Sequence, residues 1–499
     1  MTIRWEAFAL PDTFGPAELR SLDVVEGVGG EPAPTYVVPE LTPESVTRLA
    51  SVLRTAGAAL TRRPVTELAD ALGRVGERFG DAADPIRKEA LALLPGTAGV
   101  SPEMAHAILD GMAPDWMRDR LHRLVQTEFE DVAALDGFVT VRGRTAMAVG
   151  PGLCVQIVSG SVPGVGVNAL IRSLILKGPT LLKPGLGDAV LPVLFARALR
   201  EEDAALADAL AVVYWPGGST ELERAALGEA DVITVYGSDA TVSALRSSAP
   251  VTARFVGYRH RVGVGIVGRD ALTPDSVDEA AAEVASAVAM FDQRGCVCPQ
   301  VVYVEERGEI TPADFAERLA TALAEVELRL PCGRADVEDA AALHQLRGNA
   351  ELHAAAGRGV VYHGGDEASW TVVYESEPMP GPACLLRSVR VKALGEAEEL
   401  AEELGPVGDH LQTIAVAGLG DRARDLAITW GRLGASRIVP FRDASFPPPW
   451  WLHDGRGPLQ DLVRWVEVEA GSTRRRPAAV RPARSPSGGP HGDSPRPSR

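Results

Sequence analysis

The stretch Leu153–Lys183, LCVQIVSGSVPGVGVNALIRSLILKGPTLLK, decides the fold of this chain. It begins with a short apolar run typical of a buried strand (Leu153–Val158), passes through a glycine-rich turn, and continues with a helical pattern (Asn168–Lys177). A second apolar run, Thr180–Lys183, follows directly. A strand, a helix and a strand in this order predict two parallel strands of one sheet.

The alternation continues on the C-terminal side of this stretch. We predict a helix over Asp188–Arg200 and strands over Ala211–Trp215 and Val232–Tyr236, so the sheet is parallel and doubly wound, the usual platform for a dinucleotide. A second α/β unit starts near Val264 and carries Cys296. The predicted parts are a helical N-terminal region, a dinucleotide-binding domain, a cysteine-bearing domain, a closing segment and a tail (1–135, 136–263, 264–440, 441–470 and 471–499).

The composition is that of a folded protein. Of the 499 residues, 46% are hydrophobic and 23% are charged, and the formal net charge is −17. The tail from Gly471 to Arg499 holds seven arginines and one aspartate, so it carries +6 and the rest of the chain −23. An acidic body repels nucleic acid and anionic membranes, and no stretch has the roughly 20 successive apolar residues of a membrane span. We expect the tail, rich in Pro, Ser and Gly, to be disordered and solvated.

The cysteines indicate a reducing compartment. There are five of them, they form no CxxC pair, and the N-terminal sequence MTIRWEAFALPDTF lacks a basic region followed by an apolar block. We therefore expect free thiols, no secretory signal, a cytoplasmic location and no bound metal. The five are Cys154, Cys296, Cys298, Cys332 and Cys384.

Cys296 is the candidate nucleophile because it follows a helix end and a turn, Asp292-Gln293-Arg294-Gly295, and precedes an apolar strand. A thiolate is the best side-chain nucleophile for a thioester if its pKa is lowered from about 8.5, and Arg294 is the nearest cation for that purpose, unless it faces solvent. An activated Cys296 should react with iodoacetamide near neutral pH. The sequence pattern does not separate Cys296 from Cys298, and a small buried side chain is the alternative for both.

Three further features suit a dinucleotide. The glycine-rich turn contains Pro163 and Gly164 in a G-x-G-x-x-A pattern between a strand and a helix, as a phosphate-binding turn would. Lys183 ends the next strand, where it either contacts an anionic ribose or lies at a solvated strand end. Gly237 and Ser238 follow a strand and open a helix, so they either meet a cofactor phosphate or cap that helix.

The order of these motifs resembles the aldehyde dehydrogenase superfamily. Narrower still is the similarity to the long-chain fatty acyl-CoA reductase family, which includes the reductase subunit of bacterial luminescence systems. The likeness runs from about Val65 to Glu469. The motifs are GSVP, LLKP, VYGS and FDQRGC, then HLQTIAVAG, GASRIVPF, WLHDG and LVRWV (residues 160–163, 181–184, 235–238, 291–296, 410–418, 434–441, 451–455 and 462–466).

The resemblance implies an aldehyde dehydrogenase-like fold and an acyl-CoA reductase. It makes Cys296 rather than Cys298 the acyl-accepting nucleophile, Lys183 a cofactor-ribose contact, and Gly237 and Ser238 part of the dinucleotide side of the cleft. It implies NADPH, with NADH as the second choice, and an acyl-CoA or acyl-carrier thioester as substrate. It also implies a homo-oligomer or partner subunits for acyl transfer or synthesis.

Three departures from the superfamily pattern bear on the reaction. Ser161 stands where an Asn usually donates to the oxyanion, and we consider Asn168 as its substitute. Leu186 stands where NAD-preferring members carry a ribose-binding Glu, which favours NADPH. The stretch Phe255–Arg261 lacks the Glu that activates water in hydrolytic members, which favours a reductase; His260 is a minor candidate base. His453 and Asp454 line the cleft or assist proton transfer.

The alternatives are an NAD(P)-dependent aldehyde dehydrogenase, an acyl-phosphate reductase, and a non-catalytic binding subunit that keeps the fold. NADPH oxidation with acyl-CoA, acyl phosphate and free aldehyde would separate the enzymatic alternatives, and iodoacetamide labelling of Cys296 would separate them from a binding subunit. The fold class predicted in all cases is α/β, with two doubly wound parallel-sheet domains, a helical N-terminal region and a disordered tail.

Overall fold

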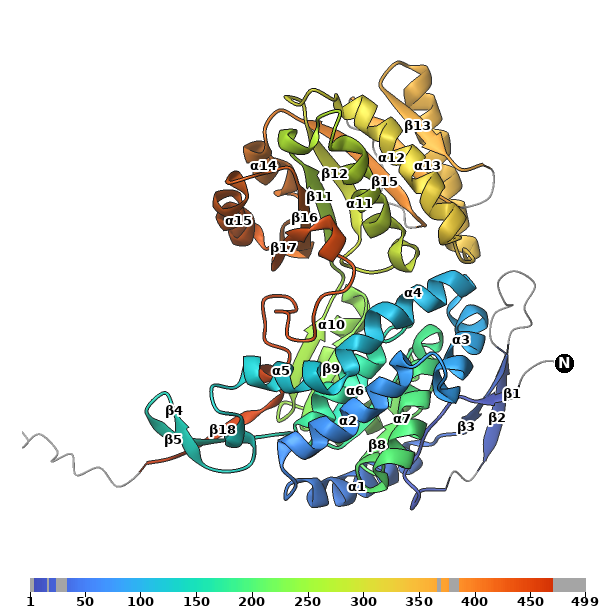
Figure 1. Cartoon of the computed structure of the whole chain (residues 1–499). Coiled ribbons are helices and arrows are strands. Elements are labelled where there is room, and N and C mark those ends of the chain that lie inside the picture. The colour runs from blue at the N-terminus through green and yellow to red at the C-terminus, as the bar shows by residue number, and fades with distance from the viewer. Residues whose placement is uncertain (1–3, 16–17, 24–33, 366–368, 377–385, 470–499) are drawn as a thin grey trace, which may run out of the picture.

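The computed structural model describes residues 4–15, 18–23, 34–365, 369–376 and 386–469 (Figure 1). The predicted basic tail and Cys384 lie outside these residues. The described chain forms two lobes, and a segment from the C-terminal part runs between them. No helix in the described ranges is both long and apolar enough to cross a membrane.

The first lobe is built on a parallel five-stranded sheet, as the Leu153–Lys183 stretch predicts. The strand order is β10-β9-β6-β7-β8, so the chain proceeds from β6 to one side and later returns to place β9 on the other. The carboxyl ends of β6 and β9 therefore form the switch point at which such sheets bind ligands. The bounds are β6 Cys154–Ile157, β7 Thr180–Lys183, β8 Leu210–Val212, β9 Val232–Tyr236 and β10 Arg254–Tyr258.

Helices cover both faces of this sheet, and those of the N-terminal region belong to it. Apolar faces of α2 to α5 share one core with α6 and α7, while α1 packs with α9 and α10 on the opposite face. The N-terminal region is therefore part of the first lobe and not a separate body. The bounds are α1 Pro43–Leu60, α2 Val65–Gly80, α3 Pro85–Ala98, α4 Pro102–Met112, α5 Arg118–Glu128, α6 Val165–Ile175, α7 Val190–Glu202, α8 Ala204–Ala207, α9 Thr220–Gly228 and α10 Asp239–Ser248.

A small sheet that the sequence analysis did not predict lies ahead of these helices. Its order is β1-β3-β2, with β1 and β3 parallel and β2 antiparallel to β3. The prediction of a helical region over residues 1–135 therefore misses three short strands that precede α1. The bounds are β1 Arg4–Glu6, β2 Leu19–Asp23 and β3 Thr35–Pro39.

The second lobe holds a seven-stranded sheet in the order β13-β14-β15-β12-β11-β16-β17. Its pairs are parallel except β13–β14. Helices α11 and α12 cover one face, and α14 and α15 the other. The strands are β11 Val262–Val267, β12 Pro299–Glu305, β13 Gly359–His363, β14 Thr371–Glu375, β15 Ser388–Leu394, β16 Leu411–Ala417 and β17 Arg437–Pro440; the helices are α11 Val277–Ala289, α12 Pro312–Arg329, α13 Val337–Ala355, α14 Leu400–Leu404 and α15 Arg422–Leu433.

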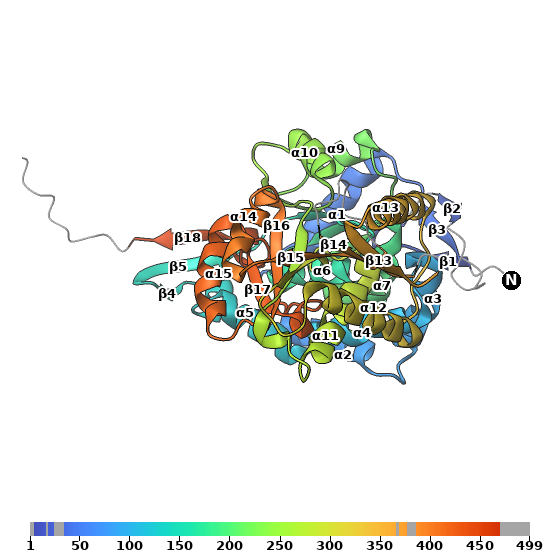
Figure 2. The same ribbon diagram turned by 90° about the horizontal axis from the view of Figure 1, so that it is seen from above.

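The closing segment after β17 crosses from the second lobe to the first (Figure 1). It ends in β18 (Arg464–Val468), which pairs antiparallel with β5 (Arg144–Val149); β4 (Val139–Val141) completes this sheet. The three strands extend away from the body in both views (Figures 1 and 2). On its way the segment is fixed to α5, because Glu128 Oε2 accepts hydrogen bonds from the main-chain N–H groups of Leu459 and Gln460 (3.1 and 3.2 Å).

Candidate active site

At the candidate site, the carboxyl ends of strands of the five-stranded sheet face the amino ends of strands of the seven-stranded sheet. Strands β9 and β10 end at Tyr236 and Tyr258, and the chain then passes through residues 259–261 into β11 of the second lobe. The amino ends of β11, β12 and β16 lie at the facing edge. Residues of the closing segment touch both sides, because His453 stacks on Tyr258 and Asp454 bonds Gln412.

Cys296 lies at this junction, between the 3-10 turn η6 (Met290–Gln293) and β12. Its side chain is partly exposed and packs against the core of the first lobe. Cys298 is fully buried, and its Sγ donates to the carbonyl oxygen of Met290 (3.3 Å). The structure thus separates two thiols that the sequence pattern left equal: Cys298 is a core residue, and Cys296 is a partly exposed residue where the two lobes meet.

The backbone before Cys296 is left-handed at three consecutive residues. Phe291, Asp292 and Gln293 have φ values of 55°, 49° and 65°. Such a conformation costs roughly 1–2 kcal/mol per non-glycine residue, so the surrounding contacts must hold it. Gln293 Nε2 donates to the carbonyl oxygens of Pro299 and Ser388 (2.8 and 2.9 Å), and its Oε1 accepts from the Ser388 N–H (2.8 Å).

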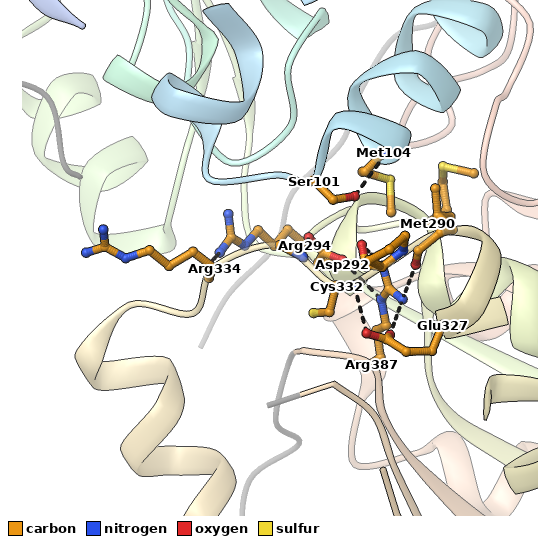
Figure 3. Close-up of polar contacts among 12 residues, drawn as sticks. Ser101, Met104, Met290, Asp292, Arg294, Glu327, Cys332, Arg334 and Arg387 are labelled. Atoms are coloured by element: carbon orange, nitrogen blue, oxygen red, sulfur yellow. Dashed lines mark hydrogen bonds and ion pairs between the residues drawn. The ribbon is translucent and has the colours of Figure 1, made fainter. Parts of the chain in front are cut away.

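A buried ion pair completes this restraint. Arg387 donates through Nε and Nη2 to Asp292 Oδ1 (3.0 and 2.7 Å) and through Nη1 to Glu327 Oε2 (2.8 Å) (Figure 3). The side chains of Arg387 and Asp292 are each 1% exposed. A buried pair of this kind is costly to break, because one charge would stay behind without a partner. The turn that carries Cys296 is therefore rigid.

Arg294 does not serve the thiol. Its guanidinium donates to the carbonyl oxygens of Ala98 (3.2 Å) and Arg334 (2.9 Å), and it extends toward Arg334 (Figure 3). Ala98 ends α3 of the first lobe, so Arg294 links the two lobes. The prediction that Arg294 activates Cys296 is wrong, because these main-chain carbonyls hold its charge elsewhere.

The polar groups around the sulfur come from three other segments. Gln412 Nε2 donates to Asp454 Oδ1 (2.7 Å), and the Gln412 side chain favours the charged form of the Cys296 thiol. Arg261 Nε lies 3.1 Å from Asp454 Oδ2, and the Asp454 side chain is 1% exposed. The charge of Arg437 also reaches the sulfur. The sequence analysis did not identify Gln412, Arg261 and Arg437 as site residues, because they lie far from Cys296 in the sequence and share no motif with it.

Burial raises the pKa of the Cys296 thiol to about 11, and the Asp454 carboxylate adds to this increase. Gln412 and Arg261 act in the opposite direction but do not outweigh burial. Burial therefore opposes a thiolate near neutral pH in the free protein. Desolvation of the charged form is the physical reason.

His453 is part of an aromatic stack. Its ring lies between Trp451 (4.4 Å between centroids) and Tyr258 (4.2 Å), and Tyr258 stacks on Tyr236 (4.5 Å). Burial and the charges of nearby arginines lower the pKa of His453 well below its ordinary value. His453 is therefore neutral at pH 7 and is held within this stack. His260, the minor candidate base, is exposed.

The glycine-rich turn is closed by a buried carboxylate. Gly164 (φ 99°) precedes α6, and its N–H and that of Gly166 both donate to Asp188 (2.6 Å each). Burial raises the pKa of Asp188 to about 7. The predicted use of the Gly164 N–H as a phosphate donor is thus at odds with the structure, since that group already has a partner. Pro163, next to it, is buried.

The two candidate oxyanion donors differ in placement. Ser161 is exposed. Asn168 is partly buried, and its Oδ1 accepts a hydrogen bond from Trp116 Nε1 (2.8 Å), so its Nδ2 is turned away from the indole.

The candidate cofactor residues lie at the carboxyl edge of the five-stranded sheet. Lys183 ends β7, is 8% exposed, and its Nζ lies 5.3 Å from the centroid of the Tyr214 ring. It is therefore not a solvated strand end, and burial lowers its pKa. Ser238 caps α10, because its Oγ accepts from the Thr241 N–H (3.2 Å). Gly237 joins β9 to this cap.

Comparison with solved structures defines the class of the protein. An NAD-dependent aldehyde dehydrogenase from Sinorhizobium meliloti superposes with a TM-score of 0.72 at 16% identity, covering 95% of this chain and 96% of that one. An NADP-dependent glyceraldehyde-3-phosphate dehydrogenase from Bacillus halodurans C-125, complexed with NADP, gives 0.71 at 15% identity, covering 93% and 99%. The chain has the aldehyde dehydrogenase fold, which confirms the predicted fold class.

The family is narrower than the fold. The family model described as "Acyl-CoA reductase (LuxC)" matches residues 60–465. The long-chain acyl-protein thioester reductase of Aliivibrio fischeri is 24% identical over 419 residues, which cover 81% of this chain and 82% of that protein. The chain belongs to the acyl-CoA reductase (LuxC) family and is an oxidoreductase, as the resemblance of its motifs predicts.

Proposed function

We propose that this protein reduces a long-chain acyl thioester to a fatty aldehyde with NADPH, through an acyl group held on Cys296. The observation that carries the proposal is the placement of one cysteine. Cys296 is a partly exposed residue at the junction between the cofactor-type sheet and the second lobe, whereas its neighbour Cys298 is fully buried.

The proposed reaction has two stages, the transfer of the acyl group to Cys296 and its reduction to the aldehyde. After the Cys296 thiol has lost its proton to solvent, the sulfur attacks the thioester carbon, a carbon–sulfur bond forms, and the carbonyl electron pair moves to oxygen. The adduct collapses when the bond to the leaving sulfur breaks, and the departing thiolate takes up a proton. When bound, NADPH would supply the hydride that reduces the acyl carbon. The alkoxide left on the Cys296 adduct re-forms the carbonyl as the carbon–sulfur bond breaks, which releases the aldehyde, and the Cys296 thiolate takes up a proton from solvent.

The site is suited to reduction rather than hydrolysis. Residues 254–261, where hydrolytic relatives of the fold were expected to hold a base, contain no carboxylate. Asp454 brings a carboxylate close to the sulfur, but Gln412 engages its Oδ1 and Arg261 pairs with its Oδ2. Gln412 holds one oxygen of this carboxylate and the Arg261 charge lies beside the other, so we expect the acyl group to persist until it is reduced.

The carboxyl edge of the five-stranded sheet fits a phosphorylated dinucleotide. Lys183 is a buried cation whose charge interacts with the Glu223 carboxylate, and the same positive charge would favour an anionic ribose. Leu186, which follows the same strand, brings no negative charge against a 2′-phosphate. Lys183 would therefore hold the ribose, with Gly237 and Ser238 beside it; the fit favours NADPH over NADH.

The donor of the acyl group is either CoA or a protein. The relative from Aliivibrio fischeri is named for a long-chain acyl group on protein, which supports a protein-bound donor and partner subunits for acyl transfer. Free thiols at Cys154, Cys296, Cys298 and Cys332 support a reducing, cytoplasmic setting.

A substrate comparison tests the proposal. NADPH oxidation is followed with a length series of acyl-CoA thioesters and with an acyl phosphate, and NADP reduction with a free fatty aldehyde and water. We expect turnover with long-chain thioesters and none of the irreversible oxidation of aldehyde to acid. Turnover with acyl phosphate alone, or steady production of acid from aldehyde, would replace the proposal by one of the two enzymatic alternatives. A chain that binds thioester without turning it over would be a binding subunit.

A further inference from the structure

We propose that Gly333 and Arg294 form a joint that sets the position of Cys296 relative to the first lobe, and that this position determines how fast the acyl group is reduced. The inference rests on the proposed function, because it assigns residues to the second stage of the reaction described above. Both residues act through the turn that carries Cys296, so they are positioning residues.

Gly333 lies where the two lobes meet, in the segment between α12 and α13. Its N–H donates to Asp292 Oδ2 (3.1 Å), in the turn before Cys296. The N–H of the next residue, Arg334, donates to the carbonyl oxygen of Gly99 (2.7 Å), which follows α3 of the first lobe. Two successive N–H groups therefore hold the nucleophile turn on one side and the first lobe on the other.

The joint has no room for a side chain at Gly333. A Cβ atom there would clash with the carbonyl oxygen of Gly99 and would lie 2.8 Å from both Asp292 Oδ2 and the Val100 Cα atom. Two of these three atoms belong to the main chain of the first lobe, and the carboxylate is fixed by the buried Arg387. A glycine is therefore needed for the turn and the first lobe to approach each other this closely.

Arg294 completes the joint from the side of the turn, two residues before Cys296. Its Nη1 donates to the carbonyl oxygen of Ala98 (3.2 Å), and its Nη2 donates to that of Arg334 (2.9 Å). Figure 3 shows the Arg294 side chain extending toward Arg334. The carbonyl groups at the end of a helix lack partners within that helix. Those of Ala98 and Gly99 find their partners in the second lobe.

Helix α3 connects the joint to the five-stranded sheet. Leu93 and Leu94 of α3 share one buried core with Leu182 of β7, the strand that ends at Lys183. A displacement at the joint therefore changes the distance between the Cys296 turn and the sheet proposed to hold the cofactor.

The two stages of the reaction should differ in their sensitivity to this distance. Reacting atoms must lie about 3–3.5 Å apart, and an error of about 1 Å can cost a factor of about 10² in rate. Reduction joins a cofactor on the first lobe to an acyl group on the second. Acyl transfer requires the thiol and the thioester but no cofactor. A displaced turn should therefore slow reduction far more than acyl transfer.

The test uses the full chain with Gly333→Ala, which adds one methyl group at the joint. The matched control is Gly348→Ala in α13, because a Cβ atom at Gly348 would meet nothing within 4 Å. Arg294→Met is a second variant that removes two hydrogen bonds without adding bulk, and it decides the matter if Gly333→Ala does not fold. Three quantities are measured: the affinity for NADPH, the single-turnover rate of CoA release, and the rate of aldehyde formation from the preformed acyl-enzyme at saturating NADPH.

For Gly333→Ala we expect aldehyde formation to slow about a hundredfold, and for Arg294→Met to slow by a smaller factor. CoA release and the affinity for NADPH should stay close to the wild-type values in both variants, and Gly348→Ala should match the wild type in all three measurements. Equal slowing of CoA release and aldehyde formation would overturn the inference, and so would wild-type rates in both joint variants.

Hydrogen exchange distinguishes failure of this inference from failure of the proposed function. The joint predicts that peptides 93–100 and 290–296, which lie in different lobes, exchange faster together in Gly333→Ala and Arg294→Met than in the wild type and Gly348→Ala. If the wild-type protein forms no aldehyde, the proposed function fails, and hydrogen exchange alone then decides: faster exchange in both peptides upholds the joint, and unchanged exchange in either peptide overturns it.

Discussion

The carboxyl ends of the five-stranded sheet and the segment around Cys296 face each other, and they draw their polar groups from different kinds of sequence position. At the carboxyl ends of the five-stranded sheet, the polar groups come from short local motifs. Most of these groups already have partners within the protein. Asp188 accepts from the N–H groups of Gly164 and Gly166, and Ser238 caps α10. The edge around Cys296 takes its groups from positions far apart in the chain. A sequence motif therefore predicts where a site lies in the fold more reliably than it predicts the role of each residue in that site.

The cysteine edge also depends on a buried charge. Replacing Arg387 by Met leaves the Asp292 carboxylate buried without its partner and frees the left-handed residues before Cys296. We expect the free energy of unfolding to fall by about 3–5 kcal/mol, measured by chemical denaturation. The matched control is Arg318→Met, whose exposed pair with Asp278 should contribute at most about 1 kcal/mol. Equal losses in both variants would mean that the turn is not held in this way.

The proposed cofactor site at the carboxyl ends of the five-stranded sheet is tested by its preference for NADPH over NADH. Leu186→Glu places a carboxylate near the proposed ribose position of Lys183, where it repels a 2′-phosphate and accepts from ribose hydroxyl groups. We expect the ratio of NADPH to NADH affinity to fall roughly tenfold, which corresponds to about 1.4 kcal/mol. Titration of both cofactors by fluorescence measures the ratio. An unchanged ratio would argue against Lys183 as a ribose contact.

The smallest effect concerns the pH dependence of the thiol. Because burial raises the pKa of Cys296 to about 11, the thiolate is scarce at pH 8, and labelling of the Cys296 peptide should rise with pH until about 11. Asp454→Asn removes the negative charge that adds to this increase and keeps an oxygen for Gln412. The labelling profile should therefore move to lower pH. A wild-type profile that levels off near pH 8 would contradict the burial of the sulfur.

Local patterns predicted the two α/β lobes well, because alternating strands and helices need only short-range periodicity. They placed Cys296 between a turn and a strand that are adjacent in the sequence, but only the resemblance of the motifs distinguished it from Cys298. They did not predict Gln412 or Arg261, because the contacts of these residues with Asp454 join segments that meet only after both lobes and the closing segment have folded. Arg294 was misjudged for the same reason: its partner Ala98 is 196 residues away.

The most direct test of the account is the location of the acyl group. The protein is mixed with a long-chain acyl-CoA in the absence of NADPH, and the intact mass and the digested peptides are measured. We predict one acyl group on the Cys296 peptide in the wild type and in Cys298→Ala, none in Cys296→Ala, and loss of the group as aldehyde when NADPH is added. An acyl group that still forms in Cys296→Ala, or that disappears in Cys298→Ala, would contradict the assignment of the nucleophile.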